Sequence, residues 1–99
     1  MIWQIKIHPL VLQEDLKSID PSQQKSILKT IQKKLSLDPE AYGKPLSGEF
    51  SGYWRLRAGD YRVVYRIIND QIMVLVVKIG IRQDDRIYQE FFARLKKIK

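Results

Sequence analysis

Arginine and tyrosine are the residues of this chain whose types and spacing could do chemistry. Between Tyr53 and Tyr88 the sequence places six arginines, with a single lysine, Lys78, among them. A guanidinium keeps its charge at any physiological pH and can donate two parallel hydrogen bonds to a phosphate. The pattern therefore predicts a phosphate-binding surface, and its arginines are Arg55, Arg57, Arg62, Arg66, Arg82 and Arg86.

Such a surface could support cleavage of RNA without a metal ion. Attack of a ribose 2′-hydroxyl on the neighbouring phosphate needs in-line positioning, neutralisation of the charge that grows on the phosphoryl oxygens, and help in moving protons. Arginine serves the second need, and Tyr88 is the candidate for the third. The chain has one histidine, His8, and no cysteine, and its glycines match no phosphate-binding loop. We therefore expect neither a metal site nor a cofactor.

The same arginines permit a plainer interpretation. Arginines on an exposed sheet face are often simply solvated, or bind an acidic protein partner. The residue types alone leave both interpretations open.

A β-hairpin is the element that would bring several of these arginines together. Gly59 and Asp60 lie between two alternating runs and suit a two-residue type II′ turn, because glycine accepts a positive φ at the first central position. The register that follows pairs Ala58 with Tyr61, Arg57 with Arg62, Leu56 with Val63 and Trp54 with Tyr65.

The two faces of this hairpin are expected to differ in character, because successive side chains of a strand alternate. Arginines directly opposite each other repel, so the basic face costs stability unless an anion or an acidic partner neutralises it. The basic face carries Tyr53, Arg55, Arg57, Arg62 and Arg66, and the apolar face carries Trp54, Leu56, Tyr61, Val63, Tyr65 and Ile67.

The rest of the chain predicts a small α+β domain. Residues 2–7 are expected to form a strand, and two helices follow, the first opened by Pro9 and the second running from Asp20 to Asp38. After the hairpin, residues 72–79 are apolar on both faces, which is typical of a central strand, and an amphipathic helix runs from Gln83 onward. The order β-α-α-β-β-β-α predicts a twisted, mainly antiparallel sheet with an N-terminal helical hairpin on one face and a C-terminal helix. Residues 1–99 are expected to form one domain.

Charge and composition limit the compartment and the partners. The 99 residues carry a net charge of +7, with a pI near 9.8, which favours nucleic acid, an anionic surface or an acidic protein. The absence of cysteine and of any long apolar stretch predicts a cytoplasmic protein that does not associate with membranes.

Three segments of the chain are similar to a known family. The run LRAGDYRVVY at 56–65, VKIGIR at 77–82 and RIY at 86–88 resemble the RelE/ParE superfamily of toxins from type II toxin-antitoxin modules, more specifically its RelE branch. The resemblance covers most of the chain. It implies a RelE-like fold and the activity of a ribosome-dependent endoribonuclease, or mRNA interferase, that cleaves messenger RNA in the ribosomal A site.

The resemblance also implies roles for individual residues. Arg62 matches the family's phosphate-contacting arginine, Arg82 its catalytic arginine after the last strand, and Tyr88 the tyrosine that serves as general base or orients a nucleobase. Arg55 stands where the family has a catalytic lysine, and Tyr53, in place of a second lysine, offers a stacking surface. Further contacts to RNA are expected from Arg57, Arg66, Lys78 and Arg86.

Partners follow from the same resemblance. A cognate acidic antitoxin would cover the basic face and, in complex, bring the toxin to operator DNA. Ribosomal RNA would be held by a basic lobe that includes Lys33, Lys34 and residues 94–99.

Two alternatives remain beside the nuclease. The ParE branch shares the fold but inhibits DNA gyrase, and a degenerate relative could bind RNA or antitoxin without catalysis. The presence of Arg62, Arg82 and Tyr88 together favours the nuclease.

Overall fold

A five-stranded sheet forms the centre of the molecule. The computed structural model describes residues 2–81 and 86–98. The strands lie in the order β1-β5-β4-β3-β2, with β1 parallel to β5 and the remaining neighbours antiparallel, which confirms the predicted mainly antiparallel α+β fold. The strands are β1 (Gln4–Ile7), β2 (Lys44–Pro45), β3 (Trp54–Ala58), β4 (Tyr61–Ile68) and β5 (Met73–Ile81).

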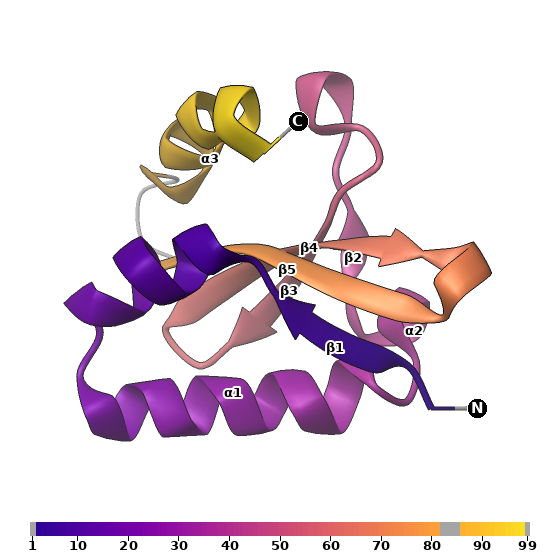
Figure 1. Ribbon diagram of the computed structural model, residues 1–99, viewed down its shortest axis with the longest axis horizontal. Helices are drawn as coiled ribbons and strands as arrows, with labels where there is room; N and C mark the ends of the chain where they lie inside the picture. The colour runs from indigo at the N-terminus through magenta and orange to yellow at the C-terminus, as the bar shows by residue number, and fades with distance from the viewer. Residues whose placement is uncertain (1, 82–85, 99) are drawn as a thin grey trace.

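Helices cover the two faces of this sheet. Figure 1 shows α1 (Pro21–Leu35) along one face and α3 (Arg86–Ile98) across the other. A short helix, α2 (Pro39–Tyr42), follows α1 and leads into β2. Asp20 caps α1 as the sequence indicates, since its carboxylate accepts a hydrogen bond from the Ser22 amide and Pro21 occupies the first helical position.

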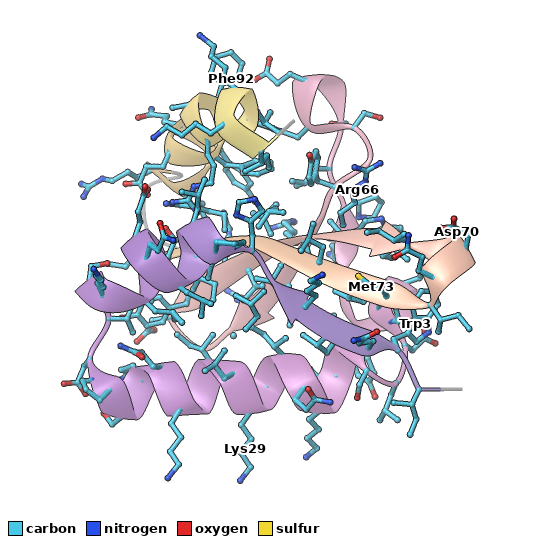
Figure 2. All side chains as sticks on the ribbon, in the orientation of Figure 1. Trp3, Lys29, Arg66, Asp70, Met73 and Phe92 are labelled. Atoms are coloured by element: carbon cyan, nitrogen blue, oxygen red, sulfur yellow. The ribbon has the colours of Figure 1, made fainter. Side chains whose placement is uncertain are left out.

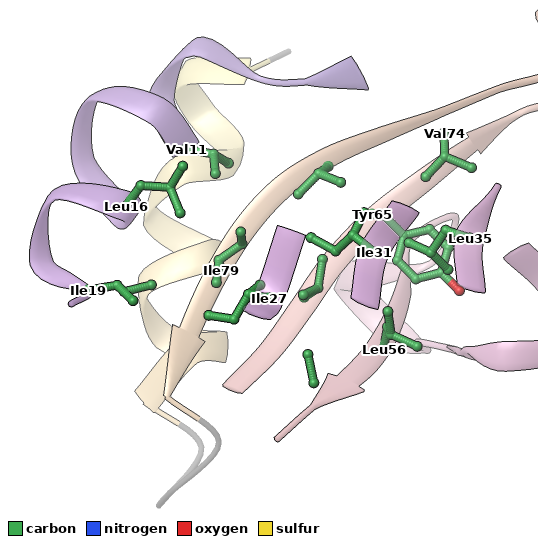
Figure 3. Close-up of a cluster of buried hydrophobic side chains, with 13 residues drawn as sticks. Val11, Leu16, Ile19, Ile27, Ile31, Leu35, Leu56, Tyr65, Val74 and Ile79 are labelled. Carbon is green, nitrogen blue, oxygen red and sulfur yellow. The ribbon is translucent and has the colours of Figure 1, made fainter. Parts of the chain in front are cut away.

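The main apolar core lies between α1 and the sheet. Ile27, Ile31 and Leu35 recur at helical spacing on α1 and are almost completely buried. They meet the apolar face of the hairpin and of β5, as Figure 3 shows. The sheet side of this core includes Leu56, Val63, Tyr65, Val74, Val76 and Ile79.

The hairpin between β3 and β4 has the predicted register. Arg57 faces Arg62 and Ala58 faces Tyr61 across the turn. Gly59 has a φ of +61°. The φ of Asp60 is negative, because Ile72 is the only described residue other than glycine with a positive φ. This combination identifies a type II′ turn, the type that the Gly-Asp pair predicts.

The first helix of the predicted pair is short and irregular. It consists of a π-helical turn, η1 (Val11–Asp15), and a 3₁₀ turn, η2 (Leu16–Ser18). β1 pairs with β5 only as far as Val76, and beyond that point the Asp15 carboxylate accepts the amide hydrogen of Ile79 at 2.9 Å. The segment therefore runs beside the edge of β5, and its Val11 and Leu16 join the core that α1 forms on one face of the sheet.

A smaller apolar cluster holds α3 against the other face. Ile87, Phe91 and Leu95 project from α3 onto Val64 of β4 and Val77 of β5. Arg62 and Arg66 alternate with Tyr61, Val63 and Tyr65 along β4, so they lie on the same face as Val64. The basic face of the hairpin is consequently the face that α3 partly covers.

Candidate active site

Arg62 and Tyr88 meet where β4 passes beneath the first turn of α3. The Arg62 Nη1 atom lies 3.4 Å from the Tyr88 hydroxyl oxygen, and the guanidinium carbon lies 5.6 Å from the centre of the tyrosine ring. The hydrogen bond is long, and the ring contact adds cation–π attraction. Sequence reasoning placed these two residues in one site, and the fold brings them together across 26 positions of the chain.

An aromatic cluster fixes the position of Tyr88. The ring of Phe50 lies 6.0 Å from that of Tyr88 and 5.5 Å from that of Phe91, and Tyr53 meets Phe91 edge to face at 5.0 Å. Phe50 belongs to a 3₁₀ turn, Gly48–Phe50, in the connector before β3. Phe50 is not predicted by the sequence, because the connector has no periodic pattern that would mark a buried side.

A basic hollow adjoins this pair beside β3. Its volume is about 250 Å³, and Arg62 forms part of its wall. None of its described lining residues carries a carboxylate. The lining residues are Tyr42, Lys44, Arg55, Leu56, Arg57 and Arg62.

The structure distributes the other predicted residues unequally. Arg55 and Arg57 share the hollow with Arg62. Arg66, which is labelled in Figure 2, is exposed. It lies four residues further along β4 than Arg62, about 13 Å away at the usual rise of a strand. Arg86 is exposed at the start of α3 and lines a different, larger cavity.

Tyr53 has less free ring surface than expected. It is half-buried and packs on Phe91 within the cluster under α3. The prediction that its ring stacks on a nucleobase stays untested, and the edge-to-face contact already occupies part of that ring. Arg82, predicted to stabilise the transition state, lies outside the described residues.

The prediction that Lys78 binds RNA is corrected by the structure. Lys78 is only 6% exposed, and its ammonium group lies 3.0 Å from both the Asp15 and the Glu90 carboxylates. Arg94, expected on the basic lobe, is only 5% exposed and bonds to Asp15 and Glu14. These two cations belong to an ion-pair network that ties α3 to η1 and β5.

Asp15 is the centre of that network. Its carboxylate accepts hydrogen bonds from Lys78, from both terminal nitrogens of Arg94 and from the Ile79 amide. Burial alone would lower the pKa of Arg94, but the hydrogen bonds and charges of Asp15 and Glu14 raise that pKa above its ordinary value. The network lines the larger cavity, of about 600 Å³, between η1, the end of β5 and α3.

Two other features bear on the kind of site. Within residues 2–81 and 86–98, no three histidine, aspartate or glutamate side chains gather closely enough to hold a metal ion. In the same part of the chain, every helix is too short or too polar to cross a bilayer.

Curated proteins match parts of this chain. The chain is 38% identical over 50 residues to toxin RelG of Mycobacterium tuberculosis, and this alignment covers 50% of this chain and 58% of RelG. It is 34% identical over 41 residues to the mRNA interferase toxin RelE of Escherichia coli, and this alignment covers 41% of this chain and 43% of RelE. The chain thus spans about half the length of these curated relatives.

Solved structures match over more of the chain, and a family model does so too. A chain of the RelBE2 toxin-antitoxin complex from Mycobacterium tuberculosis superposes with a TM-score of 0.78 at 26% identity, over 85% of this chain and 95% of that one. A mutant of E. coli RelE in the free state gives a TM-score of 0.69 at 22% identity over 100% of both chains, which shows the shared fold. The model for the ParE toxin of the type II toxin-antitoxin system parDE matches residues 5–86. The chain therefore belongs to the ParE toxin family of type II toxin-antitoxin systems, within the RelE/ParE superfamily.

Proposed function

We propose that this toxin is a ribosome-dependent endoribonuclease that cleaves messenger RNA in the ribosomal A site and so stops translation. The observation that carries the proposal is the contact between Arg62 and Tyr88 at the margin of a hollow whose described lining includes four cations. A cation that holds a phosphate and a hydroxyl that moves a proton are the two groups that RNA cleavage without a metal needs.

The reaction is an attack of a ribose 2′-oxygen on the adjacent phosphorus. The new P–O2′ bond forms as the P–O5′ bond breaks, which leaves a 2′,3′-cyclic phosphate and a 5′-hydroxyl, and one proton passes overall from the 2′-oxygen to the 5′-oxygen. Arg62 would hold the phosphate and offset the charge that grows on its oxygens, while Tyr88 would relay the proton. Arg55 would add a second positive charge, and Arg82 would stabilise the leaving oxygen.

Partners of the toxin follow from its relatives. Solved relatives include RelE–RelB complexes from Pyrococcus horikoshii and E. coli. We propose that a cognate acidic antitoxin likewise covers the basic face of this toxin in the cytoplasm and links it to operator DNA. The free toxin would then act on messenger RNA bound to the ribosome, with ribosomal RNA as its platform.

A gyrase inhibitor is the second candidate, because the matching family model is that of a ParE toxin. The two functions predict different damage in the cell. A nuclease cuts messages within translated frames, whereas a gyrase poison breaks DNA and leaves messages intact.

The test is to map the 5′ ends of messages after brief induction of the wild type, Arg62→Ala and Lys29→Ala. Lys29 is a matched control, because it is an exposed cation that points away from the sheet on α1, as Figure 2 shows. We expect new 5′ ends with the wild type and with Lys29→Ala but not with Arg62→Ala. Intact messages together with DNA breaks in the wild type would overturn the proposal in favour of gyrase.

A further inference from the structure

Two like-charge pairs lie side by side in the basic hollow. Lys44 of β2 faces Arg55 of β3, and Arg57 of β3 faces Arg62 of β4. Directly opposed residues of antiparallel strands project their side chains to the same face, only about 5 Å apart at Cβ, so each pair repels. All four side chains line the same hollow, and a bound anion would relieve both repulsions at once.

An aromatic ring completes the wall of this hollow. Tyr42, at the end of α2, is 50% exposed although it is a large aromatic residue. The ammonium of Lys34 lies 5.9 Å from the centre of its ring, and the exposed half of the residue is accessible to a further contact. A stacking surface beside a group of cations is the combination that binds single-stranded nucleic acid.

Buried contacts hold this ring in place. Asp38 caps α2 by accepting the Ala41 amide at 3.1 Å, and the buried Tyr65 hydroxyl donates a 2.6 Å hydrogen bond to the Pro39 carbonyl. The chain then passes so close to Tyr65 that a Cβ at Gly43 would overlap the tyrosine hydroxyl. Although α2 has only four residues, its end is fixed relative to β3 and β4.

We propose that this hollow is a nucleotide subsite next to the cleavage site. Lys44 and Arg57 would hold the phosphate of the nucleotide adjoining the scissile one, and Tyr42 would stack on its base. The inference rests on the proposed function, because it takes RNA as the ligand. Arg62 connects the two places, since it lines the hollow and contacts Tyr88. The exposed ring favours RNA over an acidic peptide, which needs cations but no stacking surface.

The test uses purified protein and three anionic probes followed by fluorescence anisotropy. The first probe is an RNA hexanucleotide with 2′-O-methyl riboses, which cannot be cleaved. The second is an abasic chain with the same number of phosphates, and the third is an oligoglutamate of the same net charge. The variants are Lys44→Ala, Tyr42→Ala and Tyr42→Phe, with Lys29→Ala as the matched loss of charge, and thermal unfolding confirms that each variant folds.

The variants should separate phosphate from base recognition. Tyr42→Ala should weaken binding of the hexanucleotide about tenfold and leave binding of the abasic chain unchanged. Tyr42→Phe should bind both probes as the wild type does. Lys44→Ala should weaken binding of both nucleic-acid probes several-fold. It should also reduce the magnitude of the slope of log affinity against log salt concentration by about 0.7. Lys29→Ala should change none of these values.

Three results would overturn the subsite. The first is that Lys44→Ala binds the probes as Lys29→Ala does, and the second is that Tyr42→Ala weakens binding of both nucleic-acid probes equally. The third is that the oligoglutamate binds more tightly than the hexanucleotide and that Lys44→Ala and Tyr42→Ala both weaken its binding. The last result would assign the hollow to an acidic protein. Mapping of message 5′ ends tests cleavage separately. Uncut messages together with the expected binding results would therefore refute the nuclease function and still support RNA binding in the hollow.

Discussion

The two cavities described above differ in charge balance more than in size. The larger, of about 600 Å³, combines Lys78, Arg86, Arg94 and Lys97 with the carboxylates of Glu14, Asp15 and Glu90. The smaller, of about 250 Å³, has four cations among its described lining residues and no carboxylate. Cations paired with buried carboxylates hold elements together, whereas a hollow whose described lining is cationic attracts external anions. Charge balance, rather than volume, therefore separates the structural cavity from the candidate functional one.

The largest effect is expected from Asp15→Asn in the larger cavity. Removal of this charge leaves Arg94 and Lys78 buried with less compensation, and the loss should be about 3–5 kcal/mol of unfolding free energy. Urea denaturation measures it. Glu14→Gln is the control, because the Glu14 side chain is 50% exposed and its ion pair with Arg94 should contribute no more than about 1 kcal/mol. Equal losses in the two variants would contradict a network centred on Asp15.

The opposite behaviour is expected from Arg62→Ala in the smaller cavity. Loss of one preorganised donor to the phosphate should reduce cleavage of ribosome-bound message about 10²- to 10³-fold. The unfolding free energy should change by no more than about 1 kcal/mol, since the lost repulsion between Arg57 and Arg62 offsets the lost contact with Tyr88. Single-turnover cleavage and thermal unfolding of the same preparation check both parts. A variant that loses stability together with activity would place Arg62 among the structural cations.

Tyr65→Phe tests the buried anchor of the hollow wall. The variant leaves the Pro39 carbonyl without its buried donor, which should cost about 1–3 kcal/mol. Burial, reinforced by Asp38 and Glu40, raises the pKa of Tyr65 well above its ordinary value. Above pH about 10 the unfolded chain therefore loses this proton while the folded chain keeps it, so the stability contributed by Tyr65 falls as pH rises. Denaturation from neutral to alkaline pH should show a smaller decline in Tyr65→Phe than in the wild type.

The smallest effect is expected from Arg57→Gln. Removing one member of the opposed pair should raise the unfolding free energy by about 0.2–1 kcal/mol at low salt, and added salt should reduce the gain. Thermal unfolding at two salt concentrations measures it. A loss of stability would mean that the hollow is internally compensated and would remove its contrast with the larger cavity.

The sequence predicts local features of this fold better than distant partnerships. The hairpin register follows from alternation around Gly59, and the start of α1 follows from Asp20 and Pro21, because those signals lie within a few residues of what they determine. The state of Lys78 depends on Asp15, 63 positions away, and no local pattern records that pairing.

The candidate site shows the same limit. Alternation along the hairpin placed Arg55, Arg57 and Arg62 on one face, and the structure gathers them in one hollow. Tyr42 and Lys44 went unnoticed because they come from an irregular connector, where side-chain direction is set by tertiary contacts such as that of Tyr65 with Pro39. A Tyr-Gly-Lys-Pro segment just before a basic strand is the signal that could have marked them.

The carboxylate of Asp15 has a further consequence at the rim of the sheet. Its bond to the Ile79 amide occupies a donor of β5 beyond the reach of β1, where a strand from another molecule could otherwise dock. The opposite rim is formed by β2, which has only two residues, a lysine and a proline, and both are poor templates for strand addition. The end of β5 beyond β1 and the β2 border of the sheet are thus guarded against edge-to-edge polymerisation.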